Sequence, residues 1–438
     1  MKLHFVSLGC VRNLVDSEVM LGRLKKAGWI ITQDPAEANT IVINTCSFIE
    51  AAVNESIDTI LELAQYKKRG TCKRLIVVGC LPERFREEII PALPEVDAFL
   101  GTGAFDRIIE AANGLVGFSE CLLPNPYLAA IRNYDTPRFR LTPFIAYLKV
   151  AEGCNRKCTY CIIPKLRGRQ KSRPIEDIMA EARELLSSDV KELILVAQDT
   201  SSYGKDLCPP IDLSFLLKKI STLSNRAWLR ILYGHPQNTD DKLIETVAGF
   251  PNICPYYDIP IQHASEPVLQ KMGRHYTRQS LYRLFDKIRK RSPDAALRTT
   301  VMVGFPGETD KDFETLLAFV NDICFDLLGV FIYSDFEDLP SHRLRDHVPK
   351  QLANERYDRL MSRQKEISLK KNQSRIGKVF KVLVEDSPEE NLFTGRTYFQ
   401  APEVDGIVFI HSKNLHPGAF ASVRITDALE YDLIGEAA

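Results

Sequence analysis

The sequence predicts an α/β protein in three successive parts: an amino-terminal parallel α/β sheet domain, a central incomplete barrel of six strand–helix units, and a small carboxyl-terminal β-barrel. Short apolar runs alternate with helical patterns near the amino terminus and again between Pro143 and Tyr333, which is typical of parallel sheets. After Gly377, short strands broken by turns replace the helices, as in a barrel resembling an oligonucleotide-binding fold. The expected domains are 1–135, 136–371 and 372–438.

In the amino-terminal domain, a cysteine follows each predicted strand. The expected strands are 3–8, 40–44 and 74–78, and the expected helices are 14–27, 50–66 and 83–90. Cys10, Cys46 and Cys80 lie one or two residues beyond these strands. Because the carboxyl ends of parallel strands line a common crevice, we expect the three cysteines to meet at one edge of the sheet. One cysteine there would be an ordinary small core residue, but three in successive units favour a metal site.

A second group of cysteines follows the apolar run 144–150, which predicts a buried strand. Cys154, Cys158 and Cys161 lie in the loop at its carboxyl end, at spacings of four and three. Three thiolates can hold a cluster of four irons and leave one iron open to a small molecule. Structural zinc normally takes four ligands, and the next cysteine downstream is Cys208. The loop therefore predicts an iron–sulfur site.

The central domain places polar or glycine-bearing segments where barrels carry their chemistry, at the carboxyl ends of strands. The expected strands are 144–150, 192–198, 228–233, 256–261, 297–304 and 327–333, with helices at 175–186, 279–290 and 311–321. Glycines in the segment 304–309 could let the backbone approach a planar ligand, or could form an ordinary strand-to-helix turn. The stretch 165–173 holds five cations in nine residues, which could bind an anion or simply face solvent.

A charged connecting helix is expected over 356–371, and the last domain is acidic. Its expected strands are 379–385, 395–397, 406–410 and 421–426. From Gly377 onward there are ten acidic and five basic residues, so the domain carries about minus five charges. Nucleic-acid affinity comes mainly from cations, so this surface would attract a basic protein rather than RNA, unless the acids serve only solubility.

Composition excludes several classes of protein. With 438 residues and zero formal net charge, the chain has no overall attraction to nucleic acid or to a membrane, and no apolar run has the length of a membrane helix. Eleven cysteines without a disulfide-framework spacing fit a reducing cytoplasm. Nothing requires more than a monomer. Core or surface roles are expected for Cys72, Cys121, Cys208, Cys254, Cys324, His4, His235, His263 and His275.

These motifs resemble the methylthiotransferases of the radical S-adenosylmethionine (SAM) superfamily along the whole chain. The cysteine spacing at 154–161, with Tyr160 before the last cysteine, is similar to the SAM-cluster signature. Within that family, the segments 7–18, 44–52, 198–204 and 401–406 resemble the RimO branch, which modifies an aspartate of a ribosomal protein. The segment 333–341 departs from the branch pattern and leaves the local barrel rim open to question.

The resemblance implies a methylthiotransferase domain, a radical-SAM barrel and a TRAM barrel. It implies two 4Fe-4S clusters and SAM as cofactors. The SAM-binding cluster would be held by Cys154, Cys158 and Cys161, and the auxiliary cluster by Cys10, Cys46 and Cys80. Further SAM contacts are expected from Tyr160, Gln198 and Gly304.

The implied reaction replaces a hydrogen on the β-carbon of an aspartate in small-subunit ribosomal protein twelve, giving 3-methylthioaspartate. SAM cleavage would supply a 5′-deoxyadenosyl radical, and the auxiliary cluster would supply sulfur methylated by a second SAM. The acidic TRAM barrel would bind the basic ribosomal protein, and an electron donor and a sulfur donor would also be needed.

Two alternatives stay open at this point. A tRNA nucleobase methylthiotransferase would use the same clusters, although the acidic last domain and the branch motifs speak against it. A non-catalytic iron–sulfur or zinc protein acting as a redox sensor would share the cysteines but would not cleave SAM.

Overall fold

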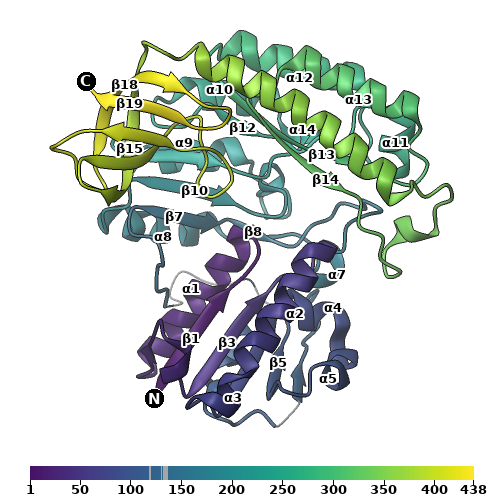
Figure 1. Ribbon diagram of the computed structural model, residues 1–438, viewed down its shortest axis with the longest axis vertical. Helices are drawn as coiled ribbons and strands as arrows, with labels where there is room; N and C mark the ends of the chain where they lie inside the picture. The colour runs from purple at the N-terminus through teal and green to yellow at the C-terminus, as the bar shows by residue number, and fades with distance from the viewer. Residues whose placement is uncertain (118–119, 130, 132–136) are drawn as a thin grey trace.

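The computed structural model describes residues 1–117, 120–129, 131 and 137–438. In Figure 1 the purple amino-terminal sheet lies below the teal barrel strands, and the yellow carboxyl-terminal barrel lies at the upper left, beside β7 and β10. The predicted domain boundary at 135/136 lies outside the described residues, and the one at 371/372 falls inside the last turn of helix α14 (Lys350–Gln373).

The amino-terminal sheet has six parallel strands in the order β2-β1-β3-β4-β5-β6. They are β1 (Lys2–Ser7), β2 (Ile30–Ile31), β3 (Thr40–Thr45), β4 (Arg74–Gly79), β5 (Ala98–Leu100) and β6 (Glu120–Leu122). The predicted strands correspond to β1, β3 and β4, with β3 buried along its whole length. The sequence does not predict β2, β5 and β6, because runs of two or three residues carry too little periodicity.

Helices connect these strands, and one predicted helix is wrong. The helices are α1 (Val11–Lys26), α2 (Glu50–Ala64), α3 (Tyr66–Arg69), α4 (Cys80–Phe85), α5 (Ile89–Ala92) and α6 (Ile108–Ala112). The expected helix 83–90 is instead split between α4, a 3-10 turn and α5. Arg86 has φ +52°, which ends α4, and its guanidinium bonds Glu83 at 3.1 Å and the Leu123 carbonyl at 3.2 Å.

The central strands form two parallel three-stranded sheets, β7-β10-β11 and β12-β13-β14. The strands are β7 (Ile145–Lys149), β10 (Glu192–Val196), β11 (Trp228–Ile231), β12 (Tyr256–Asp258), β13 (Ala296–Val303) and β14 (Leu327–Ile332), with the small antiparallel pair β8 (Ala151–Glu152) and β9 (Lys171–Ser172). A parallel bridge between Leu229 and Ile253 joins the two sheets, and β7 and β14 stay at the open edges. Six strands with open edges confirm the incomplete barrel.

Strand β12 is shorter than the predicted 256–261. Pro260 has no N–H and cannot donate to the ladder, so regular pairing stops at Asp258. A single parallel bridge, Gln262 to Val301, continues the contact with β13. The central helices are α7 (Ile163–Arg167), α8 (Ile175–Ser187), α9 (Leu213–Ser221), α10 (Asp241–Gly249), α11 (Glu266–Lys271), α12 (Arg278–Arg291) and α13 (Asp310–Ile323).

Alternate residues of the barrel strands face two different cores. Ala146 and Leu148 of β7 pack with the surrounding helices, whereas Ile145 and Tyr147 pack with the carboxyl-terminal barrel. Val11 and Val15 of α1 join this second core. The inner face of the open barrel is therefore covered by both flanking domains.

The carboxyl-terminal domain is a closed barrel in the order β15-β16-β17-β19-β18. Its strands are β15 (Val379–Glu389), β16 (Leu392–Thr397), β17 (Val408–His411), β18 (Phe420–Ala428) and β19 (Leu433–Ala437). Helix α14 leads into it and begins at Lys350, directly after Pro349, rather than at 356 as expected. No helix in the described part of the chain is both long and apolar enough to cross a membrane.

The carboxyl-terminal barrel is fixed to the central barrel by buried ion pairs. Arg396 and Arg230 both bind Glu192, at 2.6 and 2.5 Å, and all three side chains are at most 1% exposed. Asp405 accepts from the Tyr256 hydroxyl at 2.6 Å and pairs with Arg298 at 3.3 Å. Some of the acids counted in the domain charge therefore lie inside this interface.

Candidate functional site

The loop that carries Cys154, Cys158 and Cys161 is closed by the β8–β9 pair. Gly153, before the first cysteine, has φ +80°, and a Cβ there would lie 2.2 Å from the Arg169 carbonyl oxygen. Only glycine allows this approach. The Cys154 N–H then donates to the Gly168 carbonyl at 3.1 Å, which fixes the start of the loop beside its end.

The middle of this loop is held against the segment after α11. Thr159 donates from its N–H to the Met272 carbonyl at 3.1 Å and from its hydroxyl to the Lys271 carbonyl at 2.8 Å. The Tyr160 hydroxyl accepts from Arg274 at 2.7 Å, and its ring packs edge-on against Phe305. The cysteines are thereby presented from a rigid loop.

The three loop thiols interact with one another. Burial raises the pKa of the Cys161 thiol to about 12, with further contributions from the nearby Cys158 and Cys154. Burial also raises the pKa of Cys154. Among the described residues no three His, Cys, Asp or Glu side chains are grouped closely enough for a single metal ion. A multi-iron cluster, whose ligands bind different irons, fits thiols that are near but not converged on one point.

The amino-terminal cysteines follow the carboxyl ends of three adjacent parallel strands, as the sequence predicts. Cys46 directly follows β3, Cys80 begins α4, and Cys10 caps α1, three residues beyond the end of β1 rather than two. Gly9 has φ +86°, and a Cβ there would lie 2.6 Å from the Cys46 Cβ. Glycine at this position is therefore what lets Cys10 and Cys46 lie next to each other.

Two arginines face these sulfurs. Arg12 Nε donates to Cys10 Sγ at 3.4 Å, and Arg167 Nη2 donates to Cys80 Sγ at 3.6 Å. Burial raises the pKa of Cys10, but Arg12, the Asn13 N–H and Arg167 together outweigh it, and the pKa falls to about 7. Burial and the neighbouring Cys80 raise the pKa of Cys46 to about 12. Cationic surroundings of this kind suit an anionic thiolate-ligated group.

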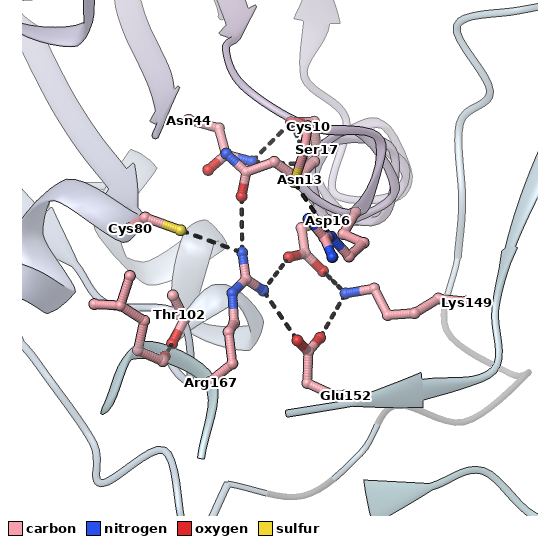
Figure 2. A network of polar contacts seen from close by, with 12 residues as sticks. Cys10, Asn13, Asp16, Ser17, Asn44, Cys80, Thr102, Lys149, Glu152 and Arg167 are labelled. Carbon is pink, nitrogen blue, oxygen red and sulfur yellow. Dashed lines mark hydrogen bonds and ion pairs between the residues drawn. The ribbon is translucent and has the colours of Figure 1, made fainter. Parts of the chain in front are cut away.

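Arg167 comes from the central domain, at the end of α7. Its Nη1 pairs with Asp16 at 2.6 Å and its Nη2 donates to Asn13 at 2.8 Å. Figure 2 shows that Asp16 also binds Lys149, and that Glu152 bridges Lys149 and Arg167. This network joins the helix after the barrel cysteine loop to the helix after Cys10.

The structure shows the local contacts of Gln198 and Gly304, two of the residues predicted to contact SAM. Gln198 donates to Glu152 at 2.5 Å, while its buried Oε1 has no hydrogen-bond partner among the described residues. Gly304 has φ +75°, and a Cβ there would lie 2.6 Å from the Ala353 Cβ of α14. Close packing against α14 already explains a glycine at 304. The SAM-binding roles of Tyr160, Gln198 and Gly304 stay predictions.

The basic stretch 165–173 is mostly engaged within the protein rather than solvated. Arg167 and Arg173 are buried, and Arg173 pairs with Asp177 at 2.6 Å and Glu181 at 2.5 Å. Lys165 donates to the Asp338 carbonyl at 2.6 Å and Lys171 to the Pro126 carbonyl at 3.2 Å. The stretch therefore ties the cysteine loop to neighbouring segments.

Sequence reasoning missed the polar residues between the two cysteine groups. Arg12, Asn13 and Asp16 stand within the segment 7–18, which the sequence analysis uses only as a family motif. A helical period over Cys10, Asn13 and Ser17 would have placed them on one face of α1, toward the cysteines. No local signal pairs Arg167 with Cys80, because the two come from different domains.

Comparisons with known proteins agree with this architecture. Three family models match: "Uncharacterized protein family UPF0004" over residues 2–101, "Radical SAM superfamily" over 148–320 and "TRAM domain" over 376–438. The radical SAM match implies a 4Fe-4S cluster and SAM as cofactors.

Among solved structures, the radical SAM methyltransferase TsrM from Kitasatospora setae superposes with a TM-score of 0.58 at 12% identity, covering 84% of this chain and 89% of that chain. The cobalamin-dependent radical enzyme OxsB gives a TM-score of 0.52 at 11% identity, over 84% of this chain and 56% of that chain. At such identities the likeness concerns the fold alone.

Curated relatives are much more similar. Proteins named "Ribosomal protein uS12 methylthiotransferase RimO" are 53% identical in Desulfosudis oleivorans, over 100% of both chains, and 45% identical in Clostridioides difficile, over 100% of this chain and 98% of the relative. The protein of that name in Geobacter sulfurreducens is 46% identical, over 99% of this chain and 98% of the relative. The chain therefore belongs to the RimO family of radical SAM methylthiotransferases.

Proposed function

We propose that this protein inserts a methylthio group at the β-carbon of an aspartate in ribosomal protein uS12, giving 3-methylthioaspartate. The observation that carries the proposal is that Arg167, six residues after the last cysteine of the barrel loop, donates to the Cys80 thiol and pairs with Asp16 in the amino-terminal domain. The names of relatives up to 53% identical over the full chain support uS12 as the substrate.

In this proposal Cys154, Cys158 and Cys161 hold the SAM-binding 4Fe-4S cluster. The support is the loop spacing, the contribution of Cys158 and Cys154 to the raised pKa of Cys161, and the position after the barrel strand β7. Gln198 lies two residues beyond the end of β10, and its buried carbonyl oxygen, which has no partner among the residues described, is suited to accept a hydrogen bond from SAM.

Cys10, Cys46 and Cys80 hold a second, auxiliary 4Fe-4S cluster. The close approach of Cys46 to Gly9 and the contacts of Arg12 and Arg167 with sulfur support this assignment. Bound together, the clusters and SAM would supply the radical and the sulfur, because no side-chain acid or base can break an unactivated C–H bond.

The protein's own side chains hold the two cysteine-bearing domains in a fixed arrangement. The ion pairs of Arg167 and Lys149 with Asp16, at 2.6 Å each, hold α7, which follows the barrel cysteine loop, against α1, which follows Cys10. Thr102, at the end of β5, donates to the Leu166 carbonyl of α7 at 2.5 Å and closes the same interface. Fixed geometry favours transfer between two bound groups over their reaction with water.

The acidic carboxyl-terminal barrel is proposed to bind the basic ribosomal protein. Glu385 and Asp405 are engaged with Arg396 and Arg298, but Asp386, Glu389 and Glu390 lie exposed at the β15–β16 turn. Reversal of charge in Glu389→Lys/Glu390→Lys should raise the KM for uS12 and leave SAM cleavage unchanged. An unchanged KM would contradict this docking surface.

The experiment that tests the function offers two substrates in parallel. Protein reconstituted without oxygen receives reductant, sulfide and SAM, together with a uS12 peptide that carries the target loop or with bulk tRNA. Mass spectrometry should detect hydrogen replaced by a methylthio group on the aspartate peptide alone. Modification of tRNA alone would overturn the proposed substrate and leave the cysteine assignments standing.

A further inference from the structure

The barrel contributes one side chain to the surroundings of the amino-terminal cysteines. Arg167 stands at the end of α7, six residues after Cys161, and is 5% exposed. Its Nη2 lies 3.6 Å from Cys80 Sγ and 2.8 Å from Asn13 Oδ1 (Figure 2). A guanidinium from one domain thus donates a hydrogen bond to a proposed cluster ligand in another.

The orientation of this guanidinium is fixed. Nη1 pairs with one oxygen of Asp16 at 2.6 Å, while the other Asp16 oxygen pairs with Lys149 at 2.6 Å. Glu152 closes the ring, 2.6 Å from Lys149 and 3.5 Å from Arg167. Bidentate and bridged arginines keep a defined direction for each N–H.

Charge in this region is not balanced by carboxylates alone. Asp16 and Glu152 offset Arg167 and Lys149, but Arg12 makes no ion pair with a carboxylate in the described part of the chain. Arg12 instead contacts Cys10 Sγ and the Ala197 carbonyl and stacks on Tyr233. The excess positive charge therefore faces the sulfurs.

Hydrogen bonds to the sulfurs and nearby positive charge both set the reduction potential of an iron–sulfur cluster. Donation of an N–H to a ligand sulfur withdraws electron density and stabilises the reduced, more negative state. The potential consequently rises with each such donor.

We propose that Arg167 is a positioning residue which raises the reduction potential of the auxiliary cluster, so that this potential depends on docking of the barrel against the amino-terminal domain. The inference rests on the auxiliary cluster of the proposed function. The step concerned adds one electron to that cluster, supplied by an electrode in the test below, and breaks no bond.

The test isolates the auxiliary cluster in the full-length chain. A Cys154→Ala/Cys158→Ala/Cys161→Ala protein is reconstituted with iron and sulfide, its iron is counted, and its reduction is followed by spectroelectrochemistry. Adding Arg167→Gln should lower the ratio of reduced to oxidised cluster at a fixed potential about tenfold, equivalent to ~59 mV for one electron. Arg167→Lys keeps the positive charge but loses the planar set of guanidinium N–H donors. It should therefore lower the reduction potential by a smaller amount.

Arg173→Gln is the matched control. Arg173 is a buried arginine of the same stretch, also 5% exposed, and its contacts are the carboxylates of Asp177 and Glu181 and the Lys149 carbonyl. Its loss should leave the potential unchanged.

The outcomes separate the two proposals. A triple-alanine protein that binds no iron overturns the auxiliary cluster itself. Iron bound with the same potential in Arg167→Gln as in its parent overturns only the role of Arg167. If Arg167→Gln fails to fold, Arg167→Lys decides, because a cation opposite Asp16 is retained, and an unshifted potential there overturns the inference. An equal shift in Arg173→Gln would also overturn it.

Discussion

The barrel triad is contained in one short loop, whereas the amino-terminal triad is collected from the ends of β1, β3 and β4. Their surroundings differ as well. Arg12 and Arg167 contact sulfur directly in the amino-terminal group. In the barrel loop Arg274 binds the Tyr160 hydroxyl and Arg156 pairs with Asp199 at 3.1 Å.

Only one thiol pKa follows this difference. The pKa of Cys10 is lowered to about 7, because Arg12, the Asn13 N–H and Arg167 together outweigh burial, whereas burial raises the pKa of both Cys46 and Cys161 to about 12. The two groups of cysteines thus differ in whether an arginine side chain donates directly to a sulfur atom.

The largest functional difference between the two groups of cysteines should appear when one cysteine of the barrel loop is removed. Cys158→Ala should abolish SAM cleavage completely, since it leaves the proposed cluster with two of its three thiol ligands. Chromatography of 5′-deoxyadenosine after a reductant-driven reaction checks this. Cys254→Ala, which removes another buried thiol, should cleave SAM normally. Persistent cleavage in Cys158→Ala would show that the barrel assignment is wrong.

Loss of an amino-terminal cysteine should spare SAM cleavage and abolish methylthio transfer. Cys46→Ala is expected to retain 5′-deoxyadenosine formation but to lose methylthio transfer, with an iron content lower by one cluster. Mass spectrometry of the uS12 peptide and an iron assay measure both effects. The control is Cys72→Ala, a buried cysteine of the same domain that donates to the Arg74 carbonyl. Normal transfer by Cys46→Ala would remove the distinction between the triads.

The buried ion pairs between the central and carboxyl-terminal barrels, which involve no cysteine, should affect the stability of the protein rather than one group of cysteines. Glu192→Gln leaves Arg230 and Arg396 without their shared charge partner, which should cost about 3–5 kcal/mol of unfolding free energy. Burial raises the pKa of Glu192, but Arg230 and Arg396 outweigh it and the pKa is lowered. Its stabilisation is present above the usual glutamate pKa of about 4.3 and is lost as the pH falls through the lowered value.

Urea unfolding at several pH values checks this sign. The variant should show a weaker loss of stability on acidification than the parent, and iron occupancy should fall equally in both triads, if at all. A selective loss in one triad would contradict the view that this interface is independent of them.

The smallest expected effect concerns the close approach of Cys10 and Cys46. Gly9→Ala should lower stability by about 1–3 kcal/mol, because φ +86° disfavours a side chain and the new Cβ would meet Cys46 at 2.6 Å. Gly28→Ala is the matched control, with φ +87° and open space around it. Auxiliary iron should fall only in Gly9→Ala, measured in the Cys154→Ala/Cys158→Ala/Cys161→Ala background. Equal iron in both variants would contradict the packing argument.

The sequence predicts the two triads unequally well, for a physical reason. Cys154, Cys158 and Cys161 are recognised from spacing alone because their geometry is local. Cys10, Cys46 and Cys80 can be grouped only through the prediction that β1, β3 and β4 are parallel neighbours, which the observed parallel pairing of these strands confirms. That prediction was possible because the three strands are long and strongly apolar.

Contacts between domains were beyond sequence reasoning. Arg167 stands in a basic stretch whose pattern fits a solvated surface as well as a binding site, and only the fold brings it to Asp16 and Cys80. The break at Arg86 likewise depends on its bonds to Glu83 and Leu123. Such features arise from residues distant in sequence, for which local propensity holds no information.

The position of Arg167 also bears on how such chains could be recombined. A chimaera that takes residues 1–117 from a relative and keeps the remaining chain would face α7 with a foreign partner for its arginine. If the relative lacks Asp16 or Asn13, a buried guanidinium would lose its acceptors. With such a relative, exchange of the amino-terminal domain should succeed only when α7 is transferred with it, so that the inherited unit crosses the domain boundary.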